Sequence, residues 1–168
     1  KPVPAEPPVV MKPTMADKAL AKLMSEAADA KAKRSGEVEA GVLDGFPYLR
    51  NEQVIYLWSG AENGGGILRI RDLRSGKQLL RVGASKATLW KLDLKRSDGE
   101  RLSHGNAGMP CKVKFAARKG EGKLSFTWPL AGVQVKVQTW LRSGESLARS
   151  RIQVEARDGG PGLMTVTF

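Results

Sequence analysis

Four tryptophans are the residues of this chain best suited to contact a sugar, because a flat aromatic face matches the apolar C–H face of a pyranose ring. Trp140 lies on the polar parity of an alternating run, and Trp58 lies at the end of a predicted strand. Both are therefore predicted to contact substrate. Trp90 and Trp128 share the parity of the inward apolar residues of their strands, which places them in the predicted core.

The sole histidine, His104, belongs with Asn106 to segment 102–106, which predicts a polar loop between strands. A catalytic triad or a zinc site needs a histidine with partners that the fold holds beside it. No acidic residue or cysteine accompanies His104 in this segment. His104 and Asn106 are therefore predicted as substrate-contact residues alongside Trp58 and Trp140, and not as catalytic residues.

Acidic residues are the other candidates for chemistry, because glycoside hydrolysis uses two facing carboxyl groups, one of them protonated. Here most of them lie in turns or beside Arg and Lys, where ionised, structural roles dominate. No pair can be singled out, so the sequence predicts no catalytic residue. The acidic residues considered are Glu52, Glu62, Asp72, Asp93, Asp98, Glu100 and Asp158.

Cofactor and metal sites are not predicted either. Cys111 is the only cysteine, which excludes an intrachain disulfide and a cysteine-cluster metal site. The glycine run at 63–66 lacks the Lys-Ser/Thr ending and the following helix of a phosphate-binding loop. We expect that run to form a flexible hairpin connection, and Cys111 to be a small strand residue.

The chain is strongly basic, with 28 Lys and Arg against 17 Asp and Glu and a formal charge of +11. Such a surface attracts polyanions. The basic residues mostly alternate with apolar ones, which is typical of solvated strand faces. A dedicated polyanion site is the alternative interpretation.

The N-terminal elements begin with a Pro-rich extended segment at 1–13, whose opening KPVPAEPP is of the kind found after a cleaved signal peptide. It predicts an extracytoplasmic protein. Thr14 and Asp17 have the spacing of a capping box, and apolar residues recur at helical spacing behind them. A helix is predicted over 14–34 within a helix and linker segment at 14–36, with Gly36 as its C-cap. Such a helix could pack on the rest of the domain or act as a spacer.

From residue 37 onward the hydrophobic period changes to two, with glycine-containing turns between short runs. This pattern predicts a mainly β domain, an antiparallel β-sandwich, over 37–168. The chain stops within a predicted strand, so we expect the sandwich to be truncated at its C-terminal end. No apolar run approaches the ~20 residues of a membrane span. The strands are predicted at 38–43, 53–58, 66–72, 77–82, 88–95, 112–118, 123–128, 133–142, 147–156 and 163–168.

A resemblance to a known family rests on three ordered features: Leu49-Arg50-Asn51-Glu52, a strand at 67–72 that leads into Ser75-Gly76-Lys77, and the strand that carries Trp90. Together with the strands at 124–128, 133–140 and 150–154, they resemble galactose-mutarotase-like β-sandwiches. Such modules precede a (β/α)₈ catalytic domain in glycoside hydrolases resembling the endo-α-N-acetylgalactosaminidase group. The helix at 14–34 is not part of this pattern.

The resemblance implies a non-catalytic N-terminal module of a secreted, carbohydrate-active protein. Its partner is then the following catalytic domain of the same parent chain, which holds the catalytic carboxylates, and the sandwich supports that domain and contacts carbohydrate. Nucleic acid is not expected as a partner, and no catalytic residue of the family maps onto this chain.

Two other functions compete with this one. The first is a stand-alone basic module that binds a polyanion, either an acidic polysaccharide or a nucleic acid, and it requires Lys and Arg to converge on one face. The second is a complete mutarotase-like enzyme, which requires a histidine and a carboxylate on one concave sheet. A single histidine in a predicted loop disfavours the enzyme.

Overall fold

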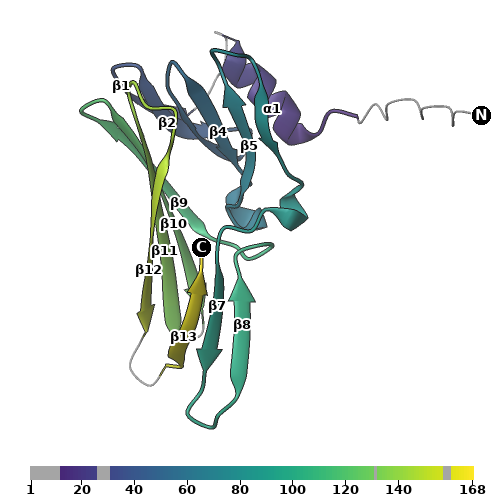
Figure 1. Ribbon diagram of the computed structural model, residues 1–168, viewed down its shortest axis with the longest axis vertical. Helices are drawn as coiled ribbons and strands as arrows, with labels where there is room; N and C mark the ends of the chain where they lie inside the picture. The colour runs from purple at the N-terminus through teal and green to yellow at the C-terminus, as the bar shows by residue number, and fades with distance from the viewer. Residues whose placement is uncertain (1–11, 26–30, 131, 157–159) are drawn as a thin grey trace, which may run out of the picture.

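The computed structural model describes residues 12–25, 31–130, 132–156 and 160–168. It is an antiparallel β-sandwich with one N-terminal helix, α1 (Met15–Met24), which confirms the predicted fold class (Figure 1). The described part of the chain contains no helix long and apolar enough to cross a bilayer. The strands are β1 (Lys31–Ser35), β2 (Val38–Leu43), β3 (Phe46–Arg50), β4 (Val54–Trp58), β5 (Ile67–Asp72), β6 (Gln78–Arg81), β7 (Lys91–Lys95), β8 (Arg101–Gly105), β9 (Lys112–Arg118), β10 (Glu121–Leu130), β11 (Val133–Arg142), β12 (Arg149–Ala156) and β13 (Gly162–Thr167).

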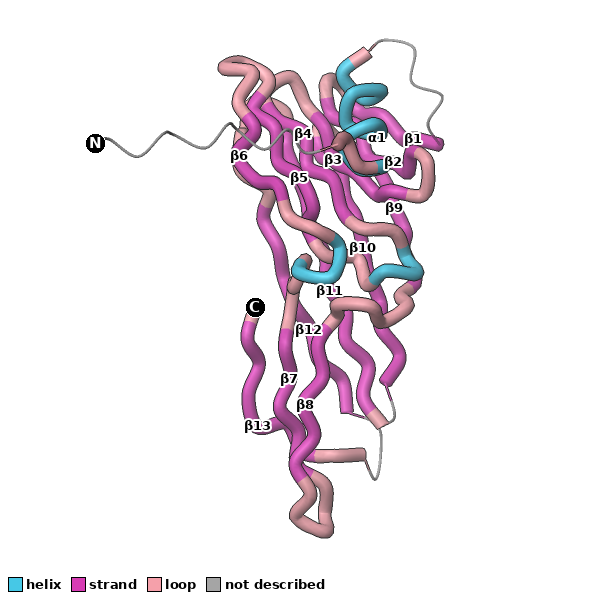
Figure 2. Tube along the Cα trace, turned by 90° about the vertical axis from the view of Figure 1, so that its right-hand side faces the viewer, coloured by secondary structure: helices cyan, strands magenta, loops and turns pink. Residues whose placement is uncertain are grey.

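Three sheets build two layers. One layer is the four-stranded sheet β12-β11-β10-β9. The opposite layer has two parts, the six-stranded meander β1 to β6 and the three-stranded sheet β13-β7-β8. Figure 2 shows β7, β8 and β13 continuing below the meander, with β9 to β12 behind both.

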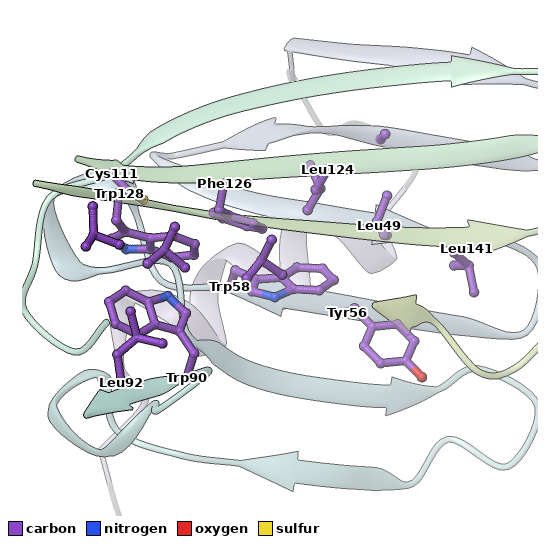
Figure 3. Close-up of a cluster of buried hydrophobic side chains, with 14 of the residues drawn as sticks. Leu49, Tyr56, Trp58, Trp90, Leu92, Cys111, Leu124, Phe126, Trp128 and Leu141 are labelled. Carbon is purple, nitrogen blue, oxygen red and sulfur yellow. The ribbon is translucent and has the colours of Figure 1, made fainter. Parts of the chain in front are cut away.

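Large aromatic side chains fill the space between the layers (Figure 3). Trp58, Trp90 and Trp128 are at most 1% exposed. Trp90 meets Trp128 edge to face with ring centroids 5.4 Å apart, and Phe126 stacks on Trp128 at 5.9 Å. The core positions predicted for Trp90 and Trp128 are therefore confirmed. Among the described residues, the three indole N–H groups have no hydrogen-bond partner.

Helix α1 packs on the outer face of the meander, so this sheet is buried on both sides. Ala19, Leu20 and Leu23 of the helix join Ile55 and Leu57 of β4 in a second hydrophobic cluster. All five residues of β4 are buried for this reason. Of the two predicted roles for the helix, packing on the sandwich is the one observed.

A buried arginine fixes the start of the helix to β5. Arg69 is 3% exposed and donates to Asp17 Oδ1 at 2.8 Å and to the Thr14 hydroxyl at 3.0 Å. Arg81 of β6 donates to Asp17 Oδ2 at 2.8 Å. Thr14 and Asp17 form the predicted capping box. The helix cap and the sheet thus share one carboxylate.

The helix is shorter than predicted. It ends at Met24, and Lys31–Ser35 form strand β1, which pairs with β2. The prediction of helix is therefore wrong for 31–34, and 26–30 lie outside the described residues, as do 1–11 of the Pro-rich segment. Gly36, with φ +59°, lies in the turn of the β1–β2 hairpin instead of capping the helix.

Besides β1, two further strands lie outside the predicted set. β3 carries Pro47 and is buried over three consecutive residues, so it lacks the alternation that marks a half-buried strand. β8 contains residues 102–105 of the segment predicted as a polar loop, and it pairs with β7 along its whole length. The structure thus places His104 on a strand.

An asparagine joins the two layers at one end of the sandwich. Asn51 Nδ2 donates to the carbonyl oxygens of Arg142 at 2.7 Å and Glu145 at 2.6 Å, while its Oδ1 accepts from the backbone N–H groups of Gln53 and Val54. The side chain is 2% exposed. The β3–β4 turn is thereby bonded to the β11–β12 hairpin.

Asp17→Asn is expected to remove an acid-sensitive part of the stability. Partial burial raises the pKa of Asp17, but hydrogen bonds from Arg69, Arg81 and Thr14 outweigh it and hold the pKa well below its usual range. Aspartate in an unfolded chain has a pKa of about 3.9. A carboxyl group whose pKa is lower in the folded state stabilises the fold at pH values above about 3.9, and this contribution is lost as the pH falls below about 3.9 toward the folded-state pKa.

We expect D17N to lower the unfolding free energy by about 1–2 kcal/mol at pH 7, because solvent reaches part of the carboxylate. The difference from the unsubstituted protein should shrink in urea titrations as pH is lowered from about 5 toward 2. A difference that stays constant over this range would contradict the shared ion pair.

Candidate binding face

The outer face of the four-stranded sheet gathers the basic side chains of four neighbouring strands. Along β9 to β12, residues alternate between the core and the outside. We call the outward set the basic sheet face. All its members are exposed or half-buried: Lys112, Lys114, Ala116, Arg118, Glu121, Lys123, Ser125, Thr127, Gln134, Lys136, Gln138, Trp140, Arg142, Arg149, Arg151, Gln153 and Glu155.

The strand register sets these side chains in rows that run across the sheet. Each row is given in the order β9, β10, β11, β12, and neighbours in a row are about 5 Å apart. One row is Lys112, Thr127, Lys136 and Gln153; the next is Lys114, Ser125, Gln138 and Arg151; the third is Ala116, Lys123, Trp140 and Arg149.

The face has eight basic side chains and two carboxylates, Glu121 and Glu155. Glu121 is paired with Arg142 at 2.9 Å and raises the pKa of that guanidinium. Arg149 pairs with Glu145 of the adjoining turn at 3.3 Å. Within the described ranges, the other six basic side chains make no ion pair. Their charges are therefore available to an external anion.

Trp140 is half-buried in the third row of this face. Its direct cross-strand neighbours are Lys123 on β10 and Arg149 on β12. The structure thus puts an accessible aromatic side chain between two cations, on the outward parity that the sequence predicted for it. Its contact with substrate stays a prediction.

Trp58 does not share this face, and the prediction of ligand contact is wrong for it. Its side chain is 0% exposed and packs against Tyr56 and Phe126, with ring centroids 5.8 and 6.1 Å away. Its place at the end of β4 does not expose it, because both faces of β4 are covered.

Asn106 is also inaccessible, with 0% exposure, so the predicted substrate contact is wrong for it as well. Its Oδ1 accepts from the backbone N–H groups of Leu89 at 2.5 Å and Trp90 at 3.0 Å. Its Nδ2 donates to the carbonyl oxygens of Gly64 at 3.1 Å and Ala87 at 3.0 Å. The amide therefore joins its own segment to the glycine run and to 87–90, and has a structural role.

The glycine run packs tightly around Asn106, contrary to the predicted flexible connection. A Cβ at Gly64 would lie 1.9 Å from the Asn106 backbone oxygen, and one at Gly66 would lie 1.8 Å from the Ala87 oxygen. Gly65, with φ +65°, would meet the Phe126 ring at 2.6 Å. Glycine is needed here for close approach of one backbone to another.

His104 lies on β8 opposite Leu92 and is half-buried. Directly paired residues of an antiparallel ladder point to the same side, so His104 shares the side of the buried core residue Leu92. That side faces the core, whereas Trp140 is on the outward side of the other layer. The four predicted contact residues therefore do not form one site.

Glu39, which is 8% exposed, is the one buried acidic residue in the described part of the chain. It accepts a hydrogen bond from Tyr48 and pairs with Arg34 at 2.5 Å, beside a polar cleft of about 150 Å³. Burial, together with Glu39, raises the pKa of Tyr48. Both groups are held by structural partners.

No nucleophile or metal centre is assembled in the described residues. Burial raises the pKa of the Cys111 thiol to about 11, which keeps it protonated at neutral pH. No group of three or more His, Cys, Asp or Glu that could hold a metal ion occurs in the described ranges. The basic sheet face is suited to binding.

Comparison with known proteins finds no matching family model, no matching curated protein and no matching solved structure.

Proposed function

We propose that this domain is a non-catalytic module that binds a polyanion on the basic sheet face. The observation that carries the proposal is the convergence of eight basic side chains, six of them without an ion-pair partner among the described residues, on one open face of β9 to β12. This convergence is what a polyanion-binding module requires, and a chain with evenly distributed charge would not have it.

The sheet suits an extended ligand. Within a row, one or two uncharged side chains separate the cations, which are therefore about 10–15 Å apart across the strands, and along β9 and β12 cations recur about 7 Å apart. A linear polyanion can meet several of them at once. Each contact is individually weak and sensitive to salt, because the side chains are exposed. Affinity therefore depends on the number of anionic groups that one polymer presents.

Charge reversal on the face tests the proposal. Lys114 and Arg151 lie in one row and are both exposed, and K114E/R151E replaces two positive charges with two negative ones. We expect at least about tenfold weaker binding to immobilised heparin or polyuronate at low salt, from roughly 1 kcal/mol per reversed charge.

The matched control is K95E/R101E, a cross-strand pair of exposed residues on β7 and β8 with the same change in net charge. It should bind almost as tightly as the unsubstituted domain. Equal weakening by the two double variants would show that net charge alone attracts the polymer, and it would overturn the proposed face.

A supporting role next to a catalytic domain of a secreted, carbohydrate-active protein is a second proposal. It is favoured by exposed apolar side chains on and beside β13, where Leu163 is 49% and Phe168 is 54% exposed, together with the resemblance to mutarotase-like modules. This role predicts no hydrolysis of a panel of chromogenic glycosides by the domain. Hydrolysis that E39Q abolishes would contradict it.

A further inference from the structure

We infer that the polyanion is an acidic polysaccharide, laid across the rows of the basic sheet face with one sugar ring on Trp140. The inference rests on the proposed function and adds the class of ligand. Three features of the face favour a charged glycan over a nucleic acid: its single aromatic side chain, its continuous sheet surface, and the neutral polar side chains between the cations.

The number of aromatic side chains argues against single-stranded nucleic acid. Proteins bind such strands by stacking successive bases on several aromatic side chains along a basic groove. Trp140 is the one aromatic residue of the basic sheet face. A single indole can stack one ring only, which suits a glycan that places one sugar ring on the indole and binds elsewhere through its charged groups.

The continuous sheet surface argues against duplex nucleic acid. Reading a duplex requires an element that enters a groove, such as a helix or a two-stranded ribbon. Here the strands β9 to β12 pair edge to edge, and the outward side chains belong to one continuous sheet. This sheet presents no such element toward the ligand.

The neutral polar side chains favour sugar hydroxyls. Ser125 and Gln138 lie between Lys114 and Arg151 in one row, and Thr127 lies in the next. An amide or hydroxyl both donates and accepts hydrogen bonds, and so does a sugar hydroxyl, whereas a phosphodiester oxygen only accepts. These three neutral side chains have no hydrogen-bond partner among the described residues, so they are available to a glycan.

The third row shows how one acidic sugar would be held. Trp140 lies between Lys123 and Arg149, its direct cross-strand neighbours. A pyranose stacked on the indole places its ring substituents toward the two flanking strands. A carboxylate or sulfate on the ring, or on the next sugar, then meets Lys123 or Arg149. Stacking and charge pairing thus act on the same sugar unit.

Titration with three polymers of matched length tests the inference: a polyuronate, a single-stranded oligonucleotide and a neutral polysaccharide. We expect the polyuronate to bind at least about tenfold more tightly than the other two, with affinity that falls as salt rises. W140A should weaken polyuronate binding about tenfold, from the loss of roughly 1.4 kcal/mol of stacking. W140F should retain most of the affinity.

F168A is the matched control, because Phe168 is exposed but lies outside the basic sheet face. It should bind the polyuronate like the unsubstituted domain. Far-UV circular dichroism verifies that W140A is folded. If W140A does not fold, W140F supplies the test instead. Complete loss of polyuronate binding in a folded W140F would contradict ring stacking.

The outcomes separate this inference from the proposed function. Tighter binding of the oligonucleotide overturns the acidic polysaccharide, and unchanged polyuronate affinity in W140A overturns the stacking of a sugar ring on Trp140. Either result leaves a polyanion-binding face. Tight, salt-independent binding of the neutral polysaccharide overturns the role of charge. Failure of both charged polymers to bind at low salt overturns the proposed function itself.

Discussion

Replacing Asn106 with alanine is expected to lower the unfolding free energy by about 3–5 kcal/mol, a large effect for a single polar side chain. The buried amide makes four hydrogen bonds to backbone groups at Gly64 and within 87–90. Alanine would leave two N–H groups and two carbonyl oxygens inside the protein without these partners, and each such group costs about 1–3 kcal/mol where water cannot replace the bond.

Urea denaturation followed by tryptophan fluorescence measures this loss, because three of the four tryptophans are buried in the adjoining core. N63A is the matched control: Asn63 lies in the same region, is exposed, and its side chain makes no hydrogen bond with the described residues. We expect N63A to change stability by less than about 0.5 kcal/mol. Similar losses in the two variants would show that Asn106 does not hold these segments together.

Gly66→Ala is expected to be similarly destabilising, by about 3 kcal/mol or more, for a steric reason. The added Cβ would lie 1.8 Å from the Ala87 oxygen and 2.6 Å from the Ala87 carbonyl carbon, both backbone atoms that cannot rotate away. Relief requires one segment to move, and Asn106 donates to that same Ala87 oxygen. The substitution therefore combines overpacking with the loss of a buried hydrogen bond.

Gly83→Ala adds the same methyl group at a position with open space. Apart from the adjoining residues, no atom lies within 4 Å of the place that the methyl carbon would take, and φ of −74° suits any residue. We expect G83A to be neutral or slightly stabilising, by up to about 1 kcal/mol, because alanine restricts the unfolded chain. Thermal or urea unfolding of the two variants compares them directly, and equal stabilities would contradict the close packing at Gly66.

Two strands with one face in the core and one outside it, β9 and β11, are among those that the sequence predicts best. Three predicted ranges, 38–43, 112–118 and 133–142, agree with β2, β9 and β11 at both ends. For β9 and β11 the reason is strict alternation, which persists because nothing described covers the outer side. The open face that makes these strands predictable is also the candidate binding face.

The prediction of strands and of side-chain direction fails where a third layer or polar residues obscure the alternation of apolar and polar residues. β4 lies between the core and α1, so burial is continuous and parity cannot decide that Trp58 points inward. β1 is rich in Lys and Arg and follows a capped helix, so its basic residues equally suit a helix C-terminus. β8 contains Ser103 and Gly105, which are typical of loops.

The candidate site can be predicted only in part. The outward position of Trp140 follows from the parity of a single strand. The gathering of cations depends on the register between four strands, which brings Lys123 of β10 and Arg149 of β12 beside Trp140. Asn51 and Asn106 carry no local signal of their roles, because their partners lie as far as 94 residues away along the chain.

The bond between Asn51 and the β11–β12 hairpin has a consequence for how the chain acquires its structure. The meander β1 to β6 is complete in sequence by Arg81, yet its inner face and Asn51 find their partners only once residues near 145 are available. Contacts so distant in sequence make folding slow, on a scale of milliseconds to seconds. During synthesis, the apolar inner face of the meander therefore stays exposed until the later strands have been made. A chaperone would bind the nascent chain mainly during this period.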